Sequence, residues 1–278
     1  MATGETDMEH DEYKIMGDIE DAYWWFVGKQ FLVEKVLNEY CLGDTGEARI
    51  LDIGCGTGGI LKLMKKYGAV CGIDFSPAAL EFSKQSGCGC LVCSDVGRHI
   101  PFKDNTFTAV TCLDVMEHLD NEGTLLEETF RVCKPGGHIV ITVPAFNALW
   151  SAHDEALHHK RRYTRRQMLR RIDRLNCSVI KVSYFNTLLF IPILVTRKLK
   201  GFLDRDKPPR SDFFMKLPGW INTALRVLYT AEIVCLSRLN FPFGVSLLVI
   251  LQKPDTGDGK AVEKEPVSRI KRAISINE

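Results

Sequence analysis

The stretch ARILDIGCGTGG, residues 48–59, decides the fold. It is a short apolar run that ends in glycines, and a segment with helical spacing follows it. Such a run is typical of a buried parallel strand that turns directly into a helix. Glycines at the turn let the backbone approach a ligand closely, with the amino end of the helix behind it. The stretch therefore predicts a nucleoside-binding loop at the carboxyl end of a strand.

Acidic residues around this loop bear on the kind of nucleoside. Gly54, Gly56 and Gly59 satisfy G-x-G-x-x-G, and Asp74 ends the next predicted strand about 20 residues further on, as in dinucleotide sites. Asp52 argues against a dinucleotide, because a carboxylate two residues before the glycines repels a pyrophosphate and suits a ligand with an ammonium group. The glycines alone leave both kinds of ligand open.

Strands and helices alternate along most of the chain. Helices of about a dozen residues between the first strands indicate βαβ units and a parallel sheet. We predict helices at 18–41, 60–67, 77–87 and 122–133, a turn at KPGG (134–137), and a helix opened by a capping box of Thr164 and Gln167. Strands are predicted at 48–54, 69–74, 91–95, 107–115, 138–144, 178–185 and 245–253.

The length of 278 residues favours one domain with an insertion. We expect a mobile N-terminus at 1–17, one domain at 18–253, and a disordered, charged tail at 254–278. Two apolar helical stretches within about 187–240 form a helical insertion between the last two strands.

Composition and charge narrow the class of protein. A net charge of +1 provides no overall field for nucleic acid, so no nucleic-acid partner is expected. The 10 cysteines follow no disulfide framework and the first residues resemble no signal peptide, so we expect reduced thiols and a cytoplasmic protein. The longest apolar run, 187–196, has about half the length of a membrane span. The sequence does not exclude a helix that lies on a membrane surface, and it therefore allows a peripheral membrane contact.

Five motifs in order carry a resemblance to a known family: ILDIGCGTGG, GIDFS, CSDV, LDVMEHL and KPGGHIVITVP. Over about residues 48–145 the chain resembles the class I S-adenosylmethionine-dependent methyltransferases, in particular the type 11/12 families. The resemblance implies a Rossmann-like α/β fold whose seven-stranded sheet ends with an antiparallel strand inserted beside the sixth, with helices on both faces. The segments YWWF, WSAHDEALHHKRRYT and LNFPFGVSLLVILQKP look like a bacterial-type methyltransferase subgroup.

The resemblance also implies a cofactor, S-adenosylmethionine, and residues that hold it. Asp52 neighbours the methionine ammonium group, Asp74 takes the ribose hydroxyls, and Asp95 lies near the adenine. The whole set implied by the motifs is Asp52, Gly54, Gly56, Gly58, Asp74, Phe75, Asp95, Val96, Leu113 and His118.

The loop at 145–163 leaves the fifth strand where an acceptor would bind. His153 titrates near neutrality and is the first candidate for a general base, provided that Asp154 holds its tautomer. Arg161 and Arg162, with Tyr163 beside them, could clamp a carboxylate or phosphate of the acceptor. The alternatives are a structural or surface histidine and a solvated basic loop.

We expect no metal. Asp114, Glu117 and His118 follow the fourth strand, and similar E-x-x-E-H stretches bind divalent metal in some small-RNA 2′-O-methyltransferases and ubiquinone-pathway O-methyltransferases. Here the first position is Asp, and a further ligand would have to come from the distant loop. Cys88, Cys90 and Cys93 could grip a soft metal, but a strand would turn alternate thiols to opposite faces.

These patterns together predict an S-adenosylmethionine-dependent methyltransferase. The leading hypothesis is O-methylation of a small or lipid-like acceptor that carries an anionic group, without an obligate protein partner. N- or S-methylation stays open, as does a catalytically silent scaffold that only binds the cofactor. A dinucleotide oxidoreductase is opposed by Asp52 and by the final strand.

Overall fold

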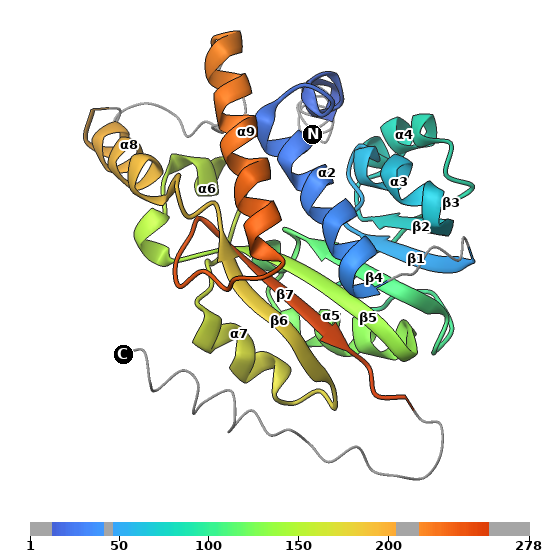
Figure 1. The fold of residues 1–278 in the computed structure, drawn as a ribbon. Coiled ribbons are helices and arrows are strands. Elements are labelled where there is room, and N and C mark those ends of the chain that lie inside the picture. Colours follow the sequence, from blue (N-terminus) through green and yellow to red (C-terminus); the bar gives the residue numbers. More distant parts are fainter. Residues whose placement is uncertain (1–12, 42–46, 204–216, 256–278) are drawn as a thin grey trace.

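The computed structural model describes residues 13–41, 47–203 and 217–255, and its centre is one seven-stranded sheet (Figure 1). The strand order is β3-β2-β1-β4-β5-β7-β6. β7 lies between β5 and β6 and runs antiparallel to both, while β1 to β5 are parallel. The predicted fold class is thereby confirmed. The strands are β1 (Ala48–Ile53), β2 (Gly68–Asp74), β3 (Cys90–Cys93), β4 (Phe107–Leu113), β5 (Cys133–Pro144), β6 (Ser178–Phe185) and β7 (Ser246–Gln252).

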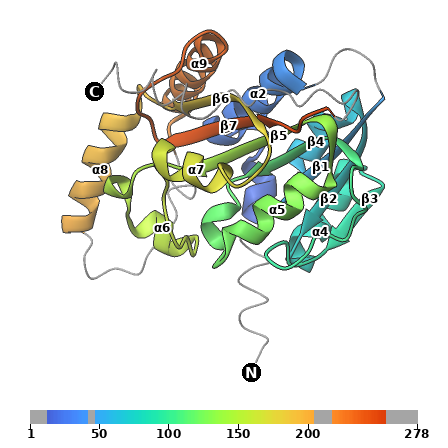
Figure 2. The same cartoon turned by 90° about the horizontal axis from the view of Figure 1, so that it is seen from below.

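Helices cover both faces of the sheet (Figures 1 and 2). One face packs against α2 and α9, with α3 and α4 towards the β2 side, and the other against α5 and α7. The helices are α2 (Trp24–Val36), α3 (Gly59–Met64), α4 (Pro77–Ser83), α5 (Glu122–Val132), α6 (Ala152–Ala156), α7 (Arg165–Ile172), α8 (Phe190–Leu203) and α9 (Gly219–Leu236).

The continuous apolar strands are explained by these two helix layers. Along β7, Leu248 and Ile250 belong to the core beneath α2 and α9, whereas Leu247, Val249 and Leu251 belong to the core against α5 and α7. Successive side chains of a strand point to opposite faces, so a strand covered on both sides must be apolar throughout. β7 is therefore buried on both of its faces.

Two predicted elements differ from the structure. The helix expected at 18–41 is divided: residues 13–19 are helical, α2 begins only at Trp24, and 37–41 are π-helical. The break coincides with Glu20, whose carboxylate accepts a hydrogen bond from Thr57 Oγ1 at 2.5 Å. KPGG is a bulge inside β5 and not a turn before it, because the β4 partner changes from Cys133 to His138 within two β4 residues.

The insertion between β6 and β7 consists of α8 and α9, as predicted in outline. α9 packs on α2, where the rings of Trp24 and Tyr229 lie 5.9 Å apart. A Cβ on Gly28 would come within 2.0 Å of the Tyr229 ring, so only glycine permits this approach. The Glu232 carboxylate accepts hydrogen bonds from the backbone of Thr187 and Leu188 just before α8. In the described part of the chain no helix is both long and apolar enough to cross a membrane.

The predicted ends of the chain fall mainly outside the described residues, which begin at 13 and end at 255. All 10 cysteines are free thiols. Cys88 Sγ contacts the backbone oxygen of Val70, and Cys90 pairs with Cys71 across β2 and β3. These contacts integrate the cysteine run into the sheet.

Candidate functional site

The glycine loop after β1 has the backbone geometry that the sequence predicts. Gly54 has a φ of 71°, and a Cβ there would come within 2.3 Å of Val115. Gly56 has a φ of 54°, but a Cβ there would meet nothing within 4 Å. Packing therefore explains the glycine at 54, whereas the open side of Gly56 leaves room for a ligand against the backbone.

Asp74, at the end of β2, ties the next strand to this loop. Its Oδ2 accepts a hydrogen bond from Gly56 N at 2.9 Å, and its Oδ1 accepts one from Ser76 N at 3.0 Å. Burial raises the pKa of Asp74, and the two N–H donors offset part of that rise. The next residue, Phe75, is a large apolar side chain that is 65% exposed. An acid and an aromatic ring thus flank the open side of the loop.

Asp52 lies deeper, and its carboxylate is almost fully buried. Thr111 Oγ1 donates a hydrogen bond to Asp52 Oδ1 at 2.6 Å. Burial, and then the nearby charge of Asp74, raise the pKa of Asp52 to about 7. No lysine or arginine in the described ranges forms an ion pair with it. A cationic ligand would supply the missing charge.

The other predicted cofactor residues follow the ends of β3 and β4. Asp95 Oδ1 accepts a hydrogen bond from Gly97 N, and its side chain is exposed beside Arg98, while Val96 is buried. Leu113 is the last residue of β4, and His118 lies in the short helix Met116–His118. Because parallel strands end at one edge, these residues and the glycine loop share that edge of the sheet.

The loop at 145–163 is closed at its base by backbone contacts. Tyr163 N donates to the oxygen of Pro144 at 2.8 Å, and Phe146 N donates to the oxygen of Tyr163 at 3.0 Å. Within the loop, Asp154 Oδ2 accepts a hydrogen bond from Ser151 N at 3.0 Å at the start of α6. The loop is therefore an ordered excursion from the end of β5.

Asp154 is the buried centre of this loop. It accepts hydrogen bonds from Arg162 Nε at 2.8 Å and Nη2 at 3.0 Å, and its Oδ1 lies 2.9 Å from His159 Nδ1. Burial alone would raise the pKa of Asp154, but the His159 hydrogen bond and the Arg162 charge hold it well below its usual range. The histidine held by Asp154 is thus His159, to which the sequence analysis assigned no role.

The remaining predicted acceptor-site residues have contacts of their own. Arg162 is 4% exposed and also donates to the oxygen of Ala145, while Arg161 is hydrogen-bonded to the carboxylate of Glu122. Tyr163 is buried in the core between the sheet and α7. The His153 ring lies 6.2 Å from that of His159. Both guanidinium groups of the predicted anion clamp are therefore already paired with acids.

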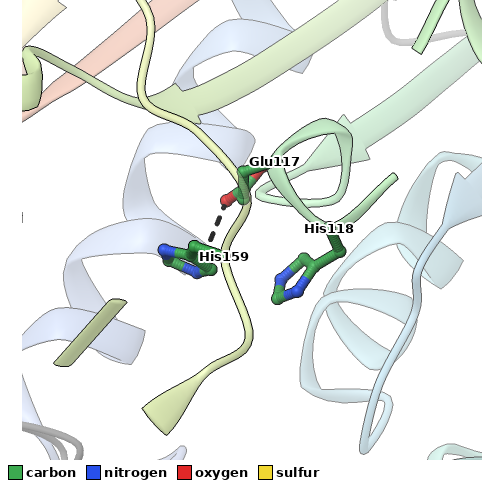
Figure 3. A group of neighbouring side chains, drawn as sticks. All are labelled: Glu117, His118 and His159. Atoms are coloured by element: carbon green, nitrogen blue, oxygen red, sulfur yellow. Dashed lines mark ion pairs between the residues drawn. The ribbon is translucent and has the colours of Figure 1, made fainter. Parts of the chain in front are cut away.

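Three side chains converge where the loop meets the end of β4 (Figure 3). Single ligand atoms of Glu117, His118 and His159 all lie within 4.8 Å of one another. The loop is tied down here because Lys160 N donates to the backbone oxygen of Glu117 at 2.7 Å. Burial and the neighbouring His159 lower the pKa of His118 to about 4. His159 therefore comes from the distant loop and lies beside Glu117 and His118, where the sequence analysis required a further ligand.

Lys29 and the role of Asp114 were not predicted from the sequence. Lys29 Nζ lies 2.7 Å from Asp114 Oδ2 and 3.1 Å from Thr142 Oγ1. The ammonium group also lies over the rings of Trp25, at 5.4 Å, and Phe185, at 5.3 Å. Asp114 has a φ of 56°, which is strained for a non-glycine residue and is common at functional sites. No local spacing links Lys29 to Asp114, so only the fold reveals the pair.

Comparisons with known proteins identify the domain. A family model described as a methyltransferase domain matches residues 51–141. The ubiquinone/menaquinone biosynthesis C-methyltransferase of Desulfotalea psychrophila is 35% identical over 49% of this chain and 55% of that protein. The ubiquinone biosynthesis O-methyltransferase of Alkalilimnicola ehrlichii is 33% identical over 37% of this chain and 44% of that protein. These comparisons match residues 51–141 to a methyltransferase domain, in agreement with the resemblance that the motifs carry.

A solved structure agrees with this methyltransferase fold. Phosphoethanolamine N-methyltransferase 2 of Haemonchus contortus, in complex with S-adenosyl-L-methionine, has a TM-score of 0.54 and 20% identity, over 82% of this chain and 53% of that one. This chain spans about half the length of the curated relatives it matches.

The Haemonchus contortus structure holds S-adenosyl-L-methionine, and the residues at the edge of the sheet in this chain fit such a cofactor. The open side of Gly56 admits a ligand against the backbone, and Asp74 presents a carboxylate beside it. The buried, unpaired charge of Asp52 suits a ligand that carries both an ammonium and a sulfonium group.

Proposed function

We propose that the protein transfers the methyl group of S-adenosylmethionine to a small or lipid-like acceptor, with an acceptor oxygen as the leading target. The observation that carries this proposal is the shared edge of the methyltransferase domain. There the glycine loop and Asp74 lie at the ends of β1 and β2, and the histidine-bearing loop leaves the end of β5. A cofactor on one part of this edge would therefore face side chains of the other.

On the cofactor side, the proposal assigns contacts to side chains that are already oriented. Asp74 accepts from the ribose hydroxyls, Asp52 balances the ammonium group, and Gly54, Gly56 and Gly58 line the loop. Phe75 offers its exposed ring to the adenine, with Asp95 and Val96 near it, and Leu113 and His118 complete the wall. Their hydrogen bonds to the backbone keep Asp74 and Asp95 in place before any ligand arrives.

When bound, the cofactor supplies an electrophilic methyl group on its sulfonium. The chain itself must align the acceptor, exclude water and take up a proton from a hydroxyl acceptor. His153 stays the proposed base, although the carboxylate of Asp154 holds His159 in its place. The Asp114 carboxylate, held by Lys29 and Thr142, is a second group on the same edge that could accept a hydrogen bond from the acceptor. The rings of Trp25 and Phe185 lie close to the Lys29 ammonium group, whose side chain is buried, whereas the Asp114 side chain is partly exposed.

The nature of the acceptor is proposed from the insertion. Leu188, Ile191, Val195 and Leu199 recur every three or four residues, each 50% to 60% exposed, so they form one apolar stripe at α8. Lys198 and Lys200 flank it. Such a helix suits an apolar acceptor or a membrane surface. The relatives named for ubiquinone biosynthesis methylate carbon or oxygen, which supports a small-molecule acceptor without naming the atom.

The proposed acceptor carries an anionic group. Arg161 and Arg162 already pair with Glu122 and Asp154, so a clamp built from them requires an exchange of partners. N- and S-methylation, and a silent cofactor-binding scaffold, stay as alternatives.

The test is turnover. The purified protein is given S-adenosylmethionine with a labelled methyl group and small-molecule extracts, and formation of S-adenosylhomocysteine and a labelled product is measured. We expect both with the wild type, and about ten- to hundredfold less of each with Asp74→Ala at limiting cofactor. Binding of the cofactor by calorimetry without product from any fraction would instead favour the scaffold. Binding of NAD in its place would overturn the proposal.

A further inference from the structure

We propose that Glu117, His118 and His159 form a site for a divalent first-row transition-metal ion. The three side chains come from the end of β4 and from the loop after β5, and they converge on one point (Figure 3). His159 Nε2 lies 4.0 Å from Glu117 Oε1, and the centres of the two imidazole rings lie 4.8 Å apart. An ion between them would need only small side-chain movements to reach ligand distances of about 2 Å.

Glu117 itself is the strongest indication of a missing ligand. Its side chain is 0% exposed, and neither carboxylate oxygen has a hydrogen-bond partner among the described residues. A buried polar group without a partner is costly, and a buried carboxylate especially so. The nearby cations are already engaged, Lys29 with Asp114 and Arg162 with Asp154. A bound cation would satisfy both oxygens at once.

His159 is oriented as a metal ligand. Asp154 is ionised and can only accept, so His159 Nδ1 carries the proton and donates it over 2.9 Å. The other ring nitrogen, Nε2, therefore presents its lone pair on the Glu117 side. A carboxylate that holds one nitrogen of a histidine while the other binds metal is a recurrent arrangement in metalloproteins. Arg162 holds that carboxylate in turn with two hydrogen bonds.

The donor set decides the class of ion. Two imidazole nitrogens and one carboxylate suit zinc, cobalt, iron or manganese, whereas magnesium and calcium prefer oxygen ligands. Three protein ligands leave at least one coordination position open. The role of the ion rests on the proposed function: an open position at the edge that holds Leu113 and His118 would take an oxygen of the acceptor. This supplies the anion recognition that the paired Arg161 and Arg162 lack.

The probe is Co²⁺, because its visible absorption reports the ligands and needs neither cofactor nor acceptor. Metal-free, reduced protein is titrated with Co²⁺, and metal content after dialysis is measured by mass spectrometry. We expect about one ion per chain and a spectrum without the intense thiolate band that the 10 cysteines would produce. His118→Gln and His159→Gln should each weaken binding at least tenfold. His99→Gln, on an exposed histidine paired with Glu128, is the matched control and should bind as the wild type does.

A second-layer variant tests the orientation argument. Asp154→Asn should weaken Co²⁺ binding about 10–100-fold. Thermal melts of all variants show whether they fold. If Asp154→Asn does not fold, Co²⁺ binding by His118→Gln decides the test. The proposal is overturned if the wild type takes up no ion, if the two ligand variants bind as well as His99→Gln, or if a thiolate band shows binding at cysteine. Each outcome is independent of turnover, so failure here leaves methyl transfer standing, and the reverse also holds.

Discussion

At the ends of β1 and β2 the groups that meet are near one another in sequence, whereas at the ends of β4 and β5 they are far apart. The bond from Gly56 to Asp74 spans 18 residues and joins a backbone N–H to a side chain. The bond from Lys29 to Asp114 spans 85 residues and joins two side chains. The cofactor edge is thus a property of local backbone turns, and the acceptor side is a product of packing.

This difference indicates which parts of such a domain can change in sequence while the fold is kept. A glycine loop depends on φ angles and leaves little freedom in residue type. Side-chain clusters on loops can change while the sheet stays the same, which is how one fold serves many acceptors. We therefore expect substitutions at the cofactor edge to change affinity for S-adenosylmethionine, and substitutions on the acceptor side to change turnover.

The largest expected effect is on the acceptor side. If His153 is the base, His153→Ala lowers kcat by roughly 10²–10⁴ and leaves cofactor affinity nearly unchanged. The measurement is steady-state kinetics with any acceptor found, together with calorimetry for the cofactor. If this variant keeps the wild-type kcat, no general base is needed and the protein acts only by positioning the acceptor and the cofactor. If it also loses affinity for the cofactor, the cofactor edge and the acceptor side are not separate in function.

The buried ion pair within the loop gives the next effect. Arg162→Met leaves Asp154 buried without its main cation, so we expect a loss of about 3–5 kcal/mol in the free energy of unfolding. Chemical denaturation measures it. Arg161→Met is the control, because its pair with Glu122 is more exposed and should be worth about 1 kcal/mol or less. Equal losses in both variants would show that Asp154 is not the centre of the loop.

Asp52 links the cofactor edge to pH. Its pKa is raised from 3.8 to about 7 in the folded protein, mainly by burial, so the unfolded state loses the proton first. Stability relative to Asp52→Asn should therefore fall as pH rises from about 4 to 7 and then level off. Between pH 5 and 8 the wild type should lose roughly 2–3 kcal/mol against the variant.

Denaturation curves at several pH values measure this difference. Saturating S-adenosylhomocysteine, whose ammonium group stabilises the ionised carboxylate, should shrink it. If the difference in unfolding free energy between the wild type and Asp52→Asn does not change with pH, or does not change when that ligand is bound, Asp52 does not belong to the cofactor site.

The smallest of the four effects is at Asp74. Asp74→Ala removes a charged hydrogen-bond acceptor worth roughly 1.5–3 kcal/mol, so affinity for S-adenosylhomocysteine should drop about ten- to hundredfold. Asp104→Ala is the control, since Asp104 is an exposed partner of Arg131 outside the predicted site. Unchanged affinity in the Asp74 variant would contradict the assignment of this residue to the ribose.

Much of the fold could be predicted because its signals are local. The period of the apolar residues, the glycines after β1, and Ser76 with Pro77 at the start of α4 each act over a few residues. The same holds for the capping box of Thr164 and Gln167, which the structure contains. The boundaries went wrong where a distant group intervened: Glu20 bonds to Thr57, and the helix predicted across 18–41 is interrupted there.

The sequence by itself determined most of the strands and helices and the glycine loop, because backbone conformation follows largely from nearby residues. The strand order and the cofactor were implied by the resemblance that the ordered motifs carry. The tertiary structure alone decided which side chains meet beyond the strands. Asp154 stands next to His153 in the chain, yet its hydrogen bonds run to His159 and Arg162. Glu117 and His159 lie on different segments, and they meet because the loop closes at Pro144 and Tyr163 and Lys160 N bonds to the oxygen of Glu117. The contacts of Asp154 depend on how the loop folds back on itself, and the contact of Glu117 with His159 depends on packing between distant segments. No local spacing encodes either.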